Sequence, residues 1–149
     1  MLDPWYITGF CDGEAAFTYS RGGASLALYF GVNQREDNRQ IIDDIRAFFD
    51  YVGKVYYRAE SKGGPKSGFS QPAAYYRVTK ISELQRIVKH FDKYPLQSSK
   101  KQEAYLVWRQ MVMYKLEHYR DIDYNILQDL AGKLSKLNLQ SRAFKVHKK

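Results

Sequence analysis

The sequence predicts an α+β protein in which antiparallel strands form a sheet and helices pack on one of its faces. Three observations lead to this prediction. Strand-like runs come in two pairs, turn-forming or Gly/Ser/Pro-rich stretches separate the runs of each pair, and helical periodicity fills the segments around them. The expected order of elements is α-β-β-α-β-β-α-α-α. We find no internal repeat and no linker, so a single domain is expected over 1-149.

The chain is expected to open with a short helix that leads into a hairpin. Asp3 can cap this helix, and Pro4 suits its first position. The helix then covers 5–14. Strand-like runs at 15–20 and 25–33 flank an Arg-Gly-Gly turn. The second run places one set of apolar side chains on a single face: Leu26, Leu28, Phe30 and Val32. This alternation predicts a hairpin with one buried face.

Helical and strand-like patterns alternate again in the rest of the chain. Helical spacing of apolar residues runs over 37–51, and Gly53 ends it. Strand-like runs at 54–60 and 74–79 flank a loop rich in Gly, Ser and Pro. The helices expected after them cover about 81–91, 100–116 and 124–137. The second of these helices places Ala104, Val107, Met111 and Tyr114 on one stripe.

Composition indicates a folded, basic protein without an internal disulfide or a cysteine-rich zinc site. Hydrophobic residues make up 44% of the chain, and the formal net charge is +8. A polyanion is therefore a plausible partner, and nucleic acid is the first candidate. Cys11 is the single cysteine, which excludes an internal disulfide and most structural zinc sites. No membrane-spanning run or secretory signal is visible, so we expect an intracellular protein with no membrane partner.

Basic residues concentrate in two regions of the sequence. From Lys133 onward the chain carries Lys and Arg but no acid, and the basic tail covers about 138–149. Such a tail is either a solvated end or a segment that wraps DNA phosphates. The strands combine Arg with Tyr, which suits a nucleic-acid-facing sheet but also occurs on an ordinary half-exposed one.

The segment Ile7-Thr-Gly-Phe-Cys-Asp-Gly-Glu-Ala15 carries the strongest chemical signal. Gly9 and Gly13 share one helix face, and each costs about 1 kcal/mol relative to Ala. That cost is reasonable if a second helix backbone approaches closely. Asp12 and Glu14 lie at the helix C-terminus, where the helix dipole disfavours anions, so a compensating cation such as Mg²⁺ is indicated. An isolated Asp-Gly-Glu could equally be a solvated turn.

These nine residues resemble the LAGLIDADG signature of homing endonucleases. The residues that match in type are Gly9, Asp12 and Glu14, and those that depart from it are Thr8, Gly13 and Ala15. The resemblance covers about two-thirds of the chain. It implies an α-β-β-α-β-β-α fold whose saddle-shaped antiparallel sheet sits on double-stranded DNA. It also implies an intron-encoded, metal-dependent nuclease that hydrolyses phosphodiester bonds in both strands and leaves 3′ overhangs.

The resemblance also implies roles for individual residues. The family carries a polar residue at the end of the second strand, here Gln34, and a basic residue before a long helix, here Lys100 with Lys101 as the fallback. Glu14, Gln34 and Lys100 are therefore the expected catalytic residues. Mg²⁺ is expected to bind Glu14, the scissile phosphate and a backbone carbonyl, which we assign to Ala15.

The single motif predicts a homodimer, because monomeric family members carry two motifs. We expect the two motif helices to pack at a two-fold axis through Gly9 and Gly13. Asp12 is expected to contribute to this interface and to the helix end rather than to the chemistry. A two-fold protein reads a palindromic or pseudo-palindromic DNA site.

Strand alternation predicts which side chains face DNA. The expected DNA-facing residues of the strands are Thr18, Ser20, Ser25, Tyr29, Asn33, Tyr56, Arg58, Glu60, Tyr75 and Arg77. Arg21, Lys62 and Lys66 are expected to add basic contacts from the turn and the loop. Arg58 and Arg77 are the best candidates for guanine contacts, because a bidentate pair between Arg and guanine is the commonest specific contact.

Two other functional classes stay open at this point. The runner-up is a non-enzymatic nucleic-acid binder on the same fold, either an intron RNA-splicing maturase or a DNA-binding regulator. The third is a basic protein–protein adaptor, whose binding would not fall steeply with salt. No small-molecule substrate is expected.

Overall fold

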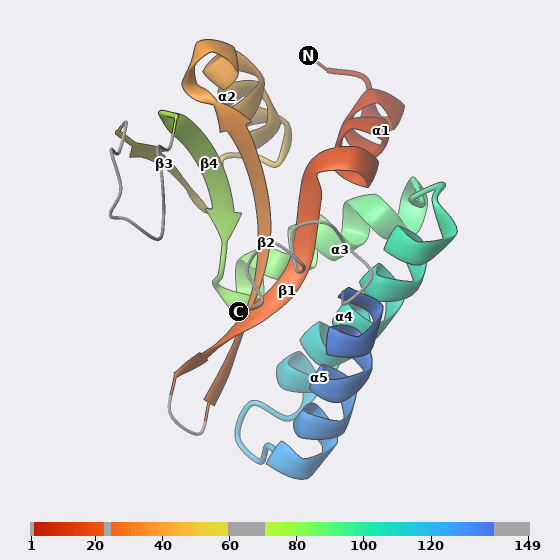
Figure 1. Ribbon diagram of the computed structural model, residues 1–149. Coiled ribbons are helices and arrows are strands. Elements are labelled where there is room, and N and C mark those ends of the chain that lie inside the picture. The colour runs from red at the N-terminus through yellow and green to blue at the C-terminus, as the bar shows by residue number, and fades with distance from the viewer. Residues whose placement is uncertain (1, 23–24, 60–70, 139–149) are drawn as a thin grey trace.

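The computed structural model describes residues 2–22, 25–59 and 71–138 (Figure 1). The elements in chain order are α1 Pro4–Glu14, β1 Ala15–Gly22, β2 Ser25–Arg35, a 3-10 turn Glu36–Asn38, α2 Arg39–Phe48, β3 Lys54–Arg58, β4 Ala73–Val78, α3 Ile81–Lys93, α4 Ser99–Glu117 and α5 Tyr124–Asn138. The predicted order is confirmed. None of the helices in these ranges is long and apolar enough to cross a membrane.

The strands form one antiparallel sheet in the order β1-β2-β4-β3. Figure 1 shows a twisted sheet with long, curved β1 and β2, while the helices gather on one side of it. The strand side chains that alternate toward the helices are buried, including Phe17, Phe30, Val32 and Tyr76. Among the described residues no helix covers the other face of the sheet, and its side chains are exposed or half-buried. The predicted α+β class, with helices on one face, is confirmed.

The first helix begins and ends as the sequence predicts. The Asp3 side chain accepts a hydrogen bond from the Trp5 backbone N–H at 2.8 Å, and Pro4 occupies the first turn. Ala15 adopts an extended backbone, so the chain passes from α1 into β1 without a loop. Glu14 is therefore fixed at the junction between the motif helix and the edge of the sheet.

An aromatic core holds the helices on the sheet. The Phe17 ring lies within 5.2–5.4 Å, centroid to centroid, of Phe30, Phe91, Tyr105 and Trp108. This one side chain of β1 therefore contacts β2, α3 and α4. The predicted α4 stripe faces the core but is too narrow. Ala104 and Met111 are buried, and Val107 and Tyr114 pack half-buried against the core. Tyr105, Trp108 and Val112 are buried as well.

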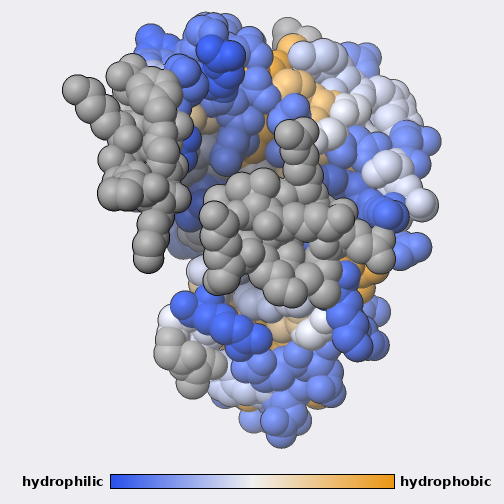
Figure 2. Space-filling view, viewed as in Figure 1, coloured by the Kyte–Doolittle hydropathy of each residue, from blue (hydrophilic) through white to orange (hydrophobic). Residues whose placement is uncertain are grey.

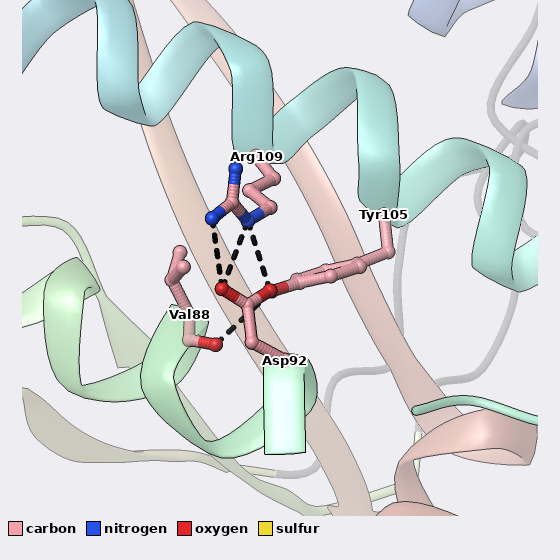
Figure 3. Close-up of polar contacts among 4 residues, drawn as sticks. All are labelled: Val88, Asp92, Tyr105 and Arg109. Atoms are coloured by element: carbon pink, nitrogen blue, oxygen red, sulfur yellow. Dashed lines mark hydrogen bonds and ion pairs between the residues drawn. The ribbon is translucent and has the colours of Figure 1, made fainter. Parts of the chain in front are cut away.

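A polar cluster joins α3 to α4 (Figure 3). The Arg109 guanidinium binds both carboxylate oxygens of Asp92 at 2.8–3.0 Å. The Tyr105 hydroxyl lies 2.8 Å from Asp92 Oδ1 and 3.1 Å from the Val88 carbonyl oxygen. Partial burial raises the pKa of Asp92, but the hydrogen bonds from Arg109 and Tyr105 outweigh it and hold that pKa below its usual value. The cluster fixes the angle between these helices and lies apart from the motif residues.

A buried histidine joins α3 to the motif helix. His90 Nε2 lies 3.0 Å from the Thr8 hydroxyl, which donates its proton to the Tyr94 carbonyl at 2.8 Å. Since that hydroxyl has one proton, the neutral imidazole must donate from Nε2. The rings of Phe48, Phe49 and Phe91 pack against the imidazole. Burial in this apolar cage lowers the pKa of His90 to about 4.

We expect acid to weaken the fold through His90. The unfolded chain protonates this side chain near pH 6.5, so between that pH and about 4 the unfolded state binds more protons. Stability should therefore fall by about 3 kcal/mol as the pH is lowered through this window. Urea unfolding at pH 7.0 and 4.5 measures the loss. A His90→Gln variant should show a flatter dependence, and equal slopes in both proteins would contradict the assignment.

Candidate active site and nucleic-acid interface

Glu14 lies at one end of the sheet, beside the ends of β2, β3 and β4. Its side chain is exposed, and it makes no hydrogen bond or ion pair within the described residues. A shallow hollow at this end is lined by Glu14, Asn33, Gln34, Arg35, Arg58, Gln71, Pro72 and Ala73. The Gln34 amide oxygen accepts a hydrogen bond from Asn38 Nδ2 at 2.9 Å. The structure therefore brings Glu14 and Gln34 to the same hollow.

The basic residue beside Glu14 is Lys101. Its ammonium donates to the Ala15 carbonyl at 2.6 Å, whereas Lys100 is exposed. Burial lowers the pKa of Lys101, and the nearby carboxylates of Asp12 and Glu14 oppose that shift. The geometry favours Lys101 over Lys100 as the basic residue of the site, because the Lys101 ammonium binds the backbone of Ala15, the residue that follows Glu14.

Asp12 fixes the start of α4 against the end of α1. Its carboxylate accepts hydrogen bonds from the Gln97 N–H at 3.0 Å, the Ser98 N–H at 2.9 Å and the Ser98 hydroxyl at 2.6 Å. Although partial burial raises the pKa of Asp12, these bonds hold it below its usual value. Ser98 directly precedes the first residue of α4, so Asp12 sets where Lys101 stands in the first turn. Its expected helix-end role matches these contacts, and its interface role stays a prediction.

The oxygen ligands available at this edge fit Mg²⁺ only if other ligands complete its shell. No group of three His, Cys, Asp or Glu side chains gathers anywhere in 2–22, 25–59 or 71–138. Glu14 supplies one free carboxylate, and Mg²⁺ commonly binds one or two carboxylates together with substrate phosphates. The Ala15 carbonyl holds the Lys101 ammonium, which would repel a second cation on the same oxygen. Glu14 therefore fits the metal better than Ala15 does.

The open face of the sheet carries most of the residues predicted to meet DNA. Those that alternate onto this face are Thr18, Ser20, Ser25, Tyr29, Asn33, Tyr56, Arg58, Tyr75 and Arg77. Glu60, Lys62 and Lys66 lie outside the described residues. The predicted surface therefore forms one continuous face of the sheet.

Arg21 lies on the other side of its strand. It alternates with Phe17 and Tyr19, so its side chain points toward the helices. The guanidinium donates to Gln128 Oε1 of α5 at 3.1 Å and lies over the Tyr19 ring. Arg21 was predicted to contact DNA from the turn. It lies instead within β1, which extends to Gly22, and its side chain points away from the predicted DNA-facing surface.

Two further cations, which the sequence analysis did not assign to the interface, lie on the open face. Lys54 stands directly opposite Arg77 in the β3–β4 pairing, and Arg35 ends β2 on the same face as Asn33. The four strands contain no acidic residue. The open face therefore presents Lys54, Arg58 and Arg77 without a strand carboxylate to neutralise them, as a polyanion-binding surface requires. Arg35 lies 3.6 Å from Asp37 in an exposed ion pair just beyond the strand.

Gly9 and Gly13 lie on an uncovered face of the motif helix. A Cβ atom added at either position would meet no described atom within 4 Å, so no contact within the described part of the chain requires glycine there. Tyr6 is 49% exposed on the same helix, and its ring lies beside Phe10. Figure 2 shows apolar surface beside α1, near the top of the view. Exposed backbone flanked by aromatic side chains suits close packing of a second helix.

Comparison with known proteins agrees with this geometry. A family model described as LAGLIDADG endonuclease matches residues 7–112. The chain belongs to the LAGLIDADG endonuclease family. The match spans α1, the sheet and most of α4, and thus includes the motif, Gln34 and Lys101.

Relatives of this LAGLIDADG endonuclease chain occur in fungi. It is 29% identical over 121 residues to an uncharacterized 50.9 kDa protein in ND4 intron 1 of Podospora anserina, which covers 75% of this chain and 24% of that protein. It is 28% identical over 125 residues to a probable intron-encoded endonuclease 2 of Neurospora crassa, which covers 78% of this chain and 25% of that protein. The chain thus spans about a quarter of the length of these relatives.

Solved structures of the family share the fold. The LAGLIDADG meganuclease I-AabMI, bound to uncleaved DNA, superposes with a TM-score of 0.73 at 25% identity over 97% of this chain and 48% of that one. The homing endonuclease I-TnaI superposes with a TM-score of 0.72 at 21% identity, over 93% of this chain and 95% of that one. The chain corresponds to about half of the first structure and to nearly all of the second.

Proposed function

We propose that this LAGLIDADG chain binds double-stranded DNA on its open sheet and hydrolyses one phosphodiester bond per strand in a metal-dependent reaction. The observation that carries the proposal is the position of Glu14 beside the Lys101 ammonium, which is bound to the next residue, Ala15. An exposed acid that makes no hydrogen bond or ion pair with any described residue stands beside a partly buried ammonium, at the end of a sheet whose four strands carry cations and no acid. A protein that only binds DNA gains nothing from a free carboxylate facing phosphate.

Each residue at this edge has a definite task in the proposal. The sheet holds the backbone of the DNA so that a phosphate lies over the hollow that Glu14 and Gln34 line. Gln34 orients the attacking water through its amide, and Lys101 stabilises the charge that develops on the phosphate. Glu14 would hold Mg²⁺, which would supply polarisation of the phosphate and a lower pKa for the attacking water. The products would carry 3′ overhangs.

The names of neighbouring structures support the choice of DNA and metal. I-AabMI was solved on uncleaved DNA, and I-SmaMI was solved with an uncleaved DNA target in the presence of calcium ions. The relative from Neurospora crassa is named as an intron-encoded endonuclease. We therefore propose the same class of substrate for this chain, and Mg²⁺ as its working ion.

Selection of cleavable sites from a randomised DNA library tests the function directly. We expect sites to be recovered in Mg²⁺ and none in EDTA, each cut in both strands, with a palindromic or pseudo-palindromic consensus. Binding should weaken steeply with added salt, because the open face neutralises phosphates. RNA binding without DNA cutting would contradict the proposal and favour a splicing factor on the same fold.

The proposed active unit is a homodimer in which two copies of α1 meet at Gly9 and Gly13. Each copy would contribute one Glu14 and cut one strand. The proposal is supported by the uncovered α1 face, where two exposed glycines weaken a helix by about 1 kcal/mol each unless a partner uses the space. The two-fold axis of such a dimer would present two identical sheets to DNA, which accounts for the palindromic or pseudo-palindromic consensus expected in the selected sites.

Alanine at these glycines should separate folding from dimerisation. Because an added Cβ meets nothing within 4 Å, Gly9→Ala and Gly13→Ala should each stabilise the folded monomer by about 1 kcal/mol and yet weaken dimerisation at least about tenfold. Thermal unfolding and solution mass against concentration measure the two effects. Gly132→Ala on α5 is the matched control, since its added Cβ also meets nothing. An unchanged dimer constant in the α1 variants would contradict the interface.

A further inference from the structure

Arg77 lies in an aromatic stack on the open face of the sheet. Its guanidinium carbon lies 4.3 Å from the centre of the Tyr29 ring and 5.5 Å from the centre of the Tyr75 ring. Tyr75 stacks in turn on Tyr56, with ring centroids 5.2 Å apart and an interplanar angle of 20°. The stack crosses three strands, because Tyr29 comes from β2, Tyr75 and Arg77 from β4, and Tyr56 from β3.

A missing side chain makes room for this arrangement. Gly31 follows Tyr29 by two residues on the same face of β2, and it stands opposite Arg77 in the β2–β4 pairing. A Cβ atom there would lie 3.6–3.7 Å from the edge of the Tyr29 ring, in ordinary contact. Alanine would therefore fit, while a branched side chain would occupy the space into which the ring leans. Gly31 thus allows Tyr29 to reach across toward Arg77.

The electrostatic setting leaves the charge of Arg77 uncompensated within the described part of the chain. The residue opposite it on β3 is Lys54, so two cations face each other across the strands. Like charges in such a pair destabilise a sheet. The tyrosine faces offset part of this cost through cation–π attraction, which Arg gains more readily than Lys. They also limit the rotation of a long side chain that is otherwise exposed.

We propose that Tyr29 and Tyr75 hold the Arg77 guanidinium in a fixed orientation, so that its outer edge reads one guanine in the major groove of each half-site. Arg77 is the specificity-determining residue, and the two tyrosines are positioning residues that act through it. A guanidinium ordered before binding loses less entropy when it pairs with the O6 and N7 atoms of guanine. Arg58, which has no aromatic partner among the described residues, discriminates less. The inference rests on the proposed DNA-cutting function.

Per-position preferences of cleaved sites, selected from the randomised library, test this inference. The wild-type dimer should show one strong guanine in each half-site. Arg77→Met should reduce that preference about ten- to a hundredfold, and Tyr29→Leu about five- to tenfold, with other positions unchanged. Tyr29→Phe, which keeps the stacking ring, should retain it. Gly31→Val should act like Tyr29→Leu, and Gly31→Ala should behave as the wild type.

Binding to modified DNA separates positioning from folding. Replacing the selected guanine with 7-deazaguanine removes the N7 acceptor and should weaken binding of the wild type and Tyr29→Phe about tenfold. The same replacement should leave the DNA affinity of Arg77→Met unchanged. A Tyr29→Leu profile identical to that of the wild type, or an Arg77→Met profile that changes at every position or at none, would overturn the inference. Failure of the proposed function itself looks different, because the wild type would then yield no cleaved site.

Discussion

Replacing Glu14 with Gln is expected to abolish cleavage of a selected site while the protein still folds and binds DNA. Glu14 ends α1 on the exposed side and makes no hydrogen bond or ion pair with another described side chain, so the amide breaks no such internal contact. The carboxylate charge is what a divalent cation needs at this position. We expect the single-turnover rate to fall by at least about 10³-fold. DNA affinity should stay the same or rise slightly, because a negative charge beside phosphate has been removed.

The control for this variant is Glu36→Gln. Glu36 is another exposed acid close to the same end of the sheet, where its carboxylate lies 3.8 Å from Arg39 in a solvent-exposed ion pair. Such pairs contribute little to stability, so the rate should stay within a few-fold of the wild type. The comparison measures single-turnover cleavage in Mg²⁺ and binding in its absence. Cleavage retained by Glu14→Gln would remove the acid from the mechanism.

Local chemistry made much of this fold predictable. The cap formed by Asp3 and Pro4, the run of the motif helix to Glu14 and the alternation of each strand depend on neighbours within a few residues. The structure has each of these features in the expected place. The two faces of β2 and β4 could therefore be assigned from sequence, because a period of two residues fixes which side chains share a face.

Features set by contacts between distant segments could not be predicted in the same way. Helix α4 packs against the sheet, α3 and α5, so its buried surface is wider than one stripe and includes Trp108, whose indole N–H donates to the Thr18 carbonyl. Which of Lys100 and Lys101 lies beside Glu14 depends on the hydrogen bonds by which Asp12 positions the start of that helix. Lys54 could have been assigned to the open face from sequence, because it lies two residues before Tyr56 in the same strand. Only its place opposite Arg77 depends on the register of β3 on β4.

Lys101 is the second position at which a single change should remove most of the activity. Lys101→Met keeps the length of the aliphatic chain and deletes the ammonium that lies 2.6 Å from the Ala15 carbonyl. If this cation stabilises charge on the scissile phosphate, the single-turnover rate should fall about 10²–10³-fold, as for loss of one preorganised donor. DNA affinity should change far less. Lys101→Arg keeps the charge but not the compact shape, so it should recover only part of the rate.

Lys100→Met provides the comparison that decides between neighbouring lysines. Lys100 is exposed at the start of the same helix, so its loss should lower DNA affinity through one phosphate contact at most and leave the rate within a few-fold. Lys101→Met also leaves the Ala15 carbonyl without its donor, which costs about 1–3 kcal/mol of stability. Activity is therefore compared below the unfolding transition of each variant. A large rate loss in Lys100→Met with none in Lys101→Met would show that the ammonium on Ala15 only stabilises the junction between α1 and β1.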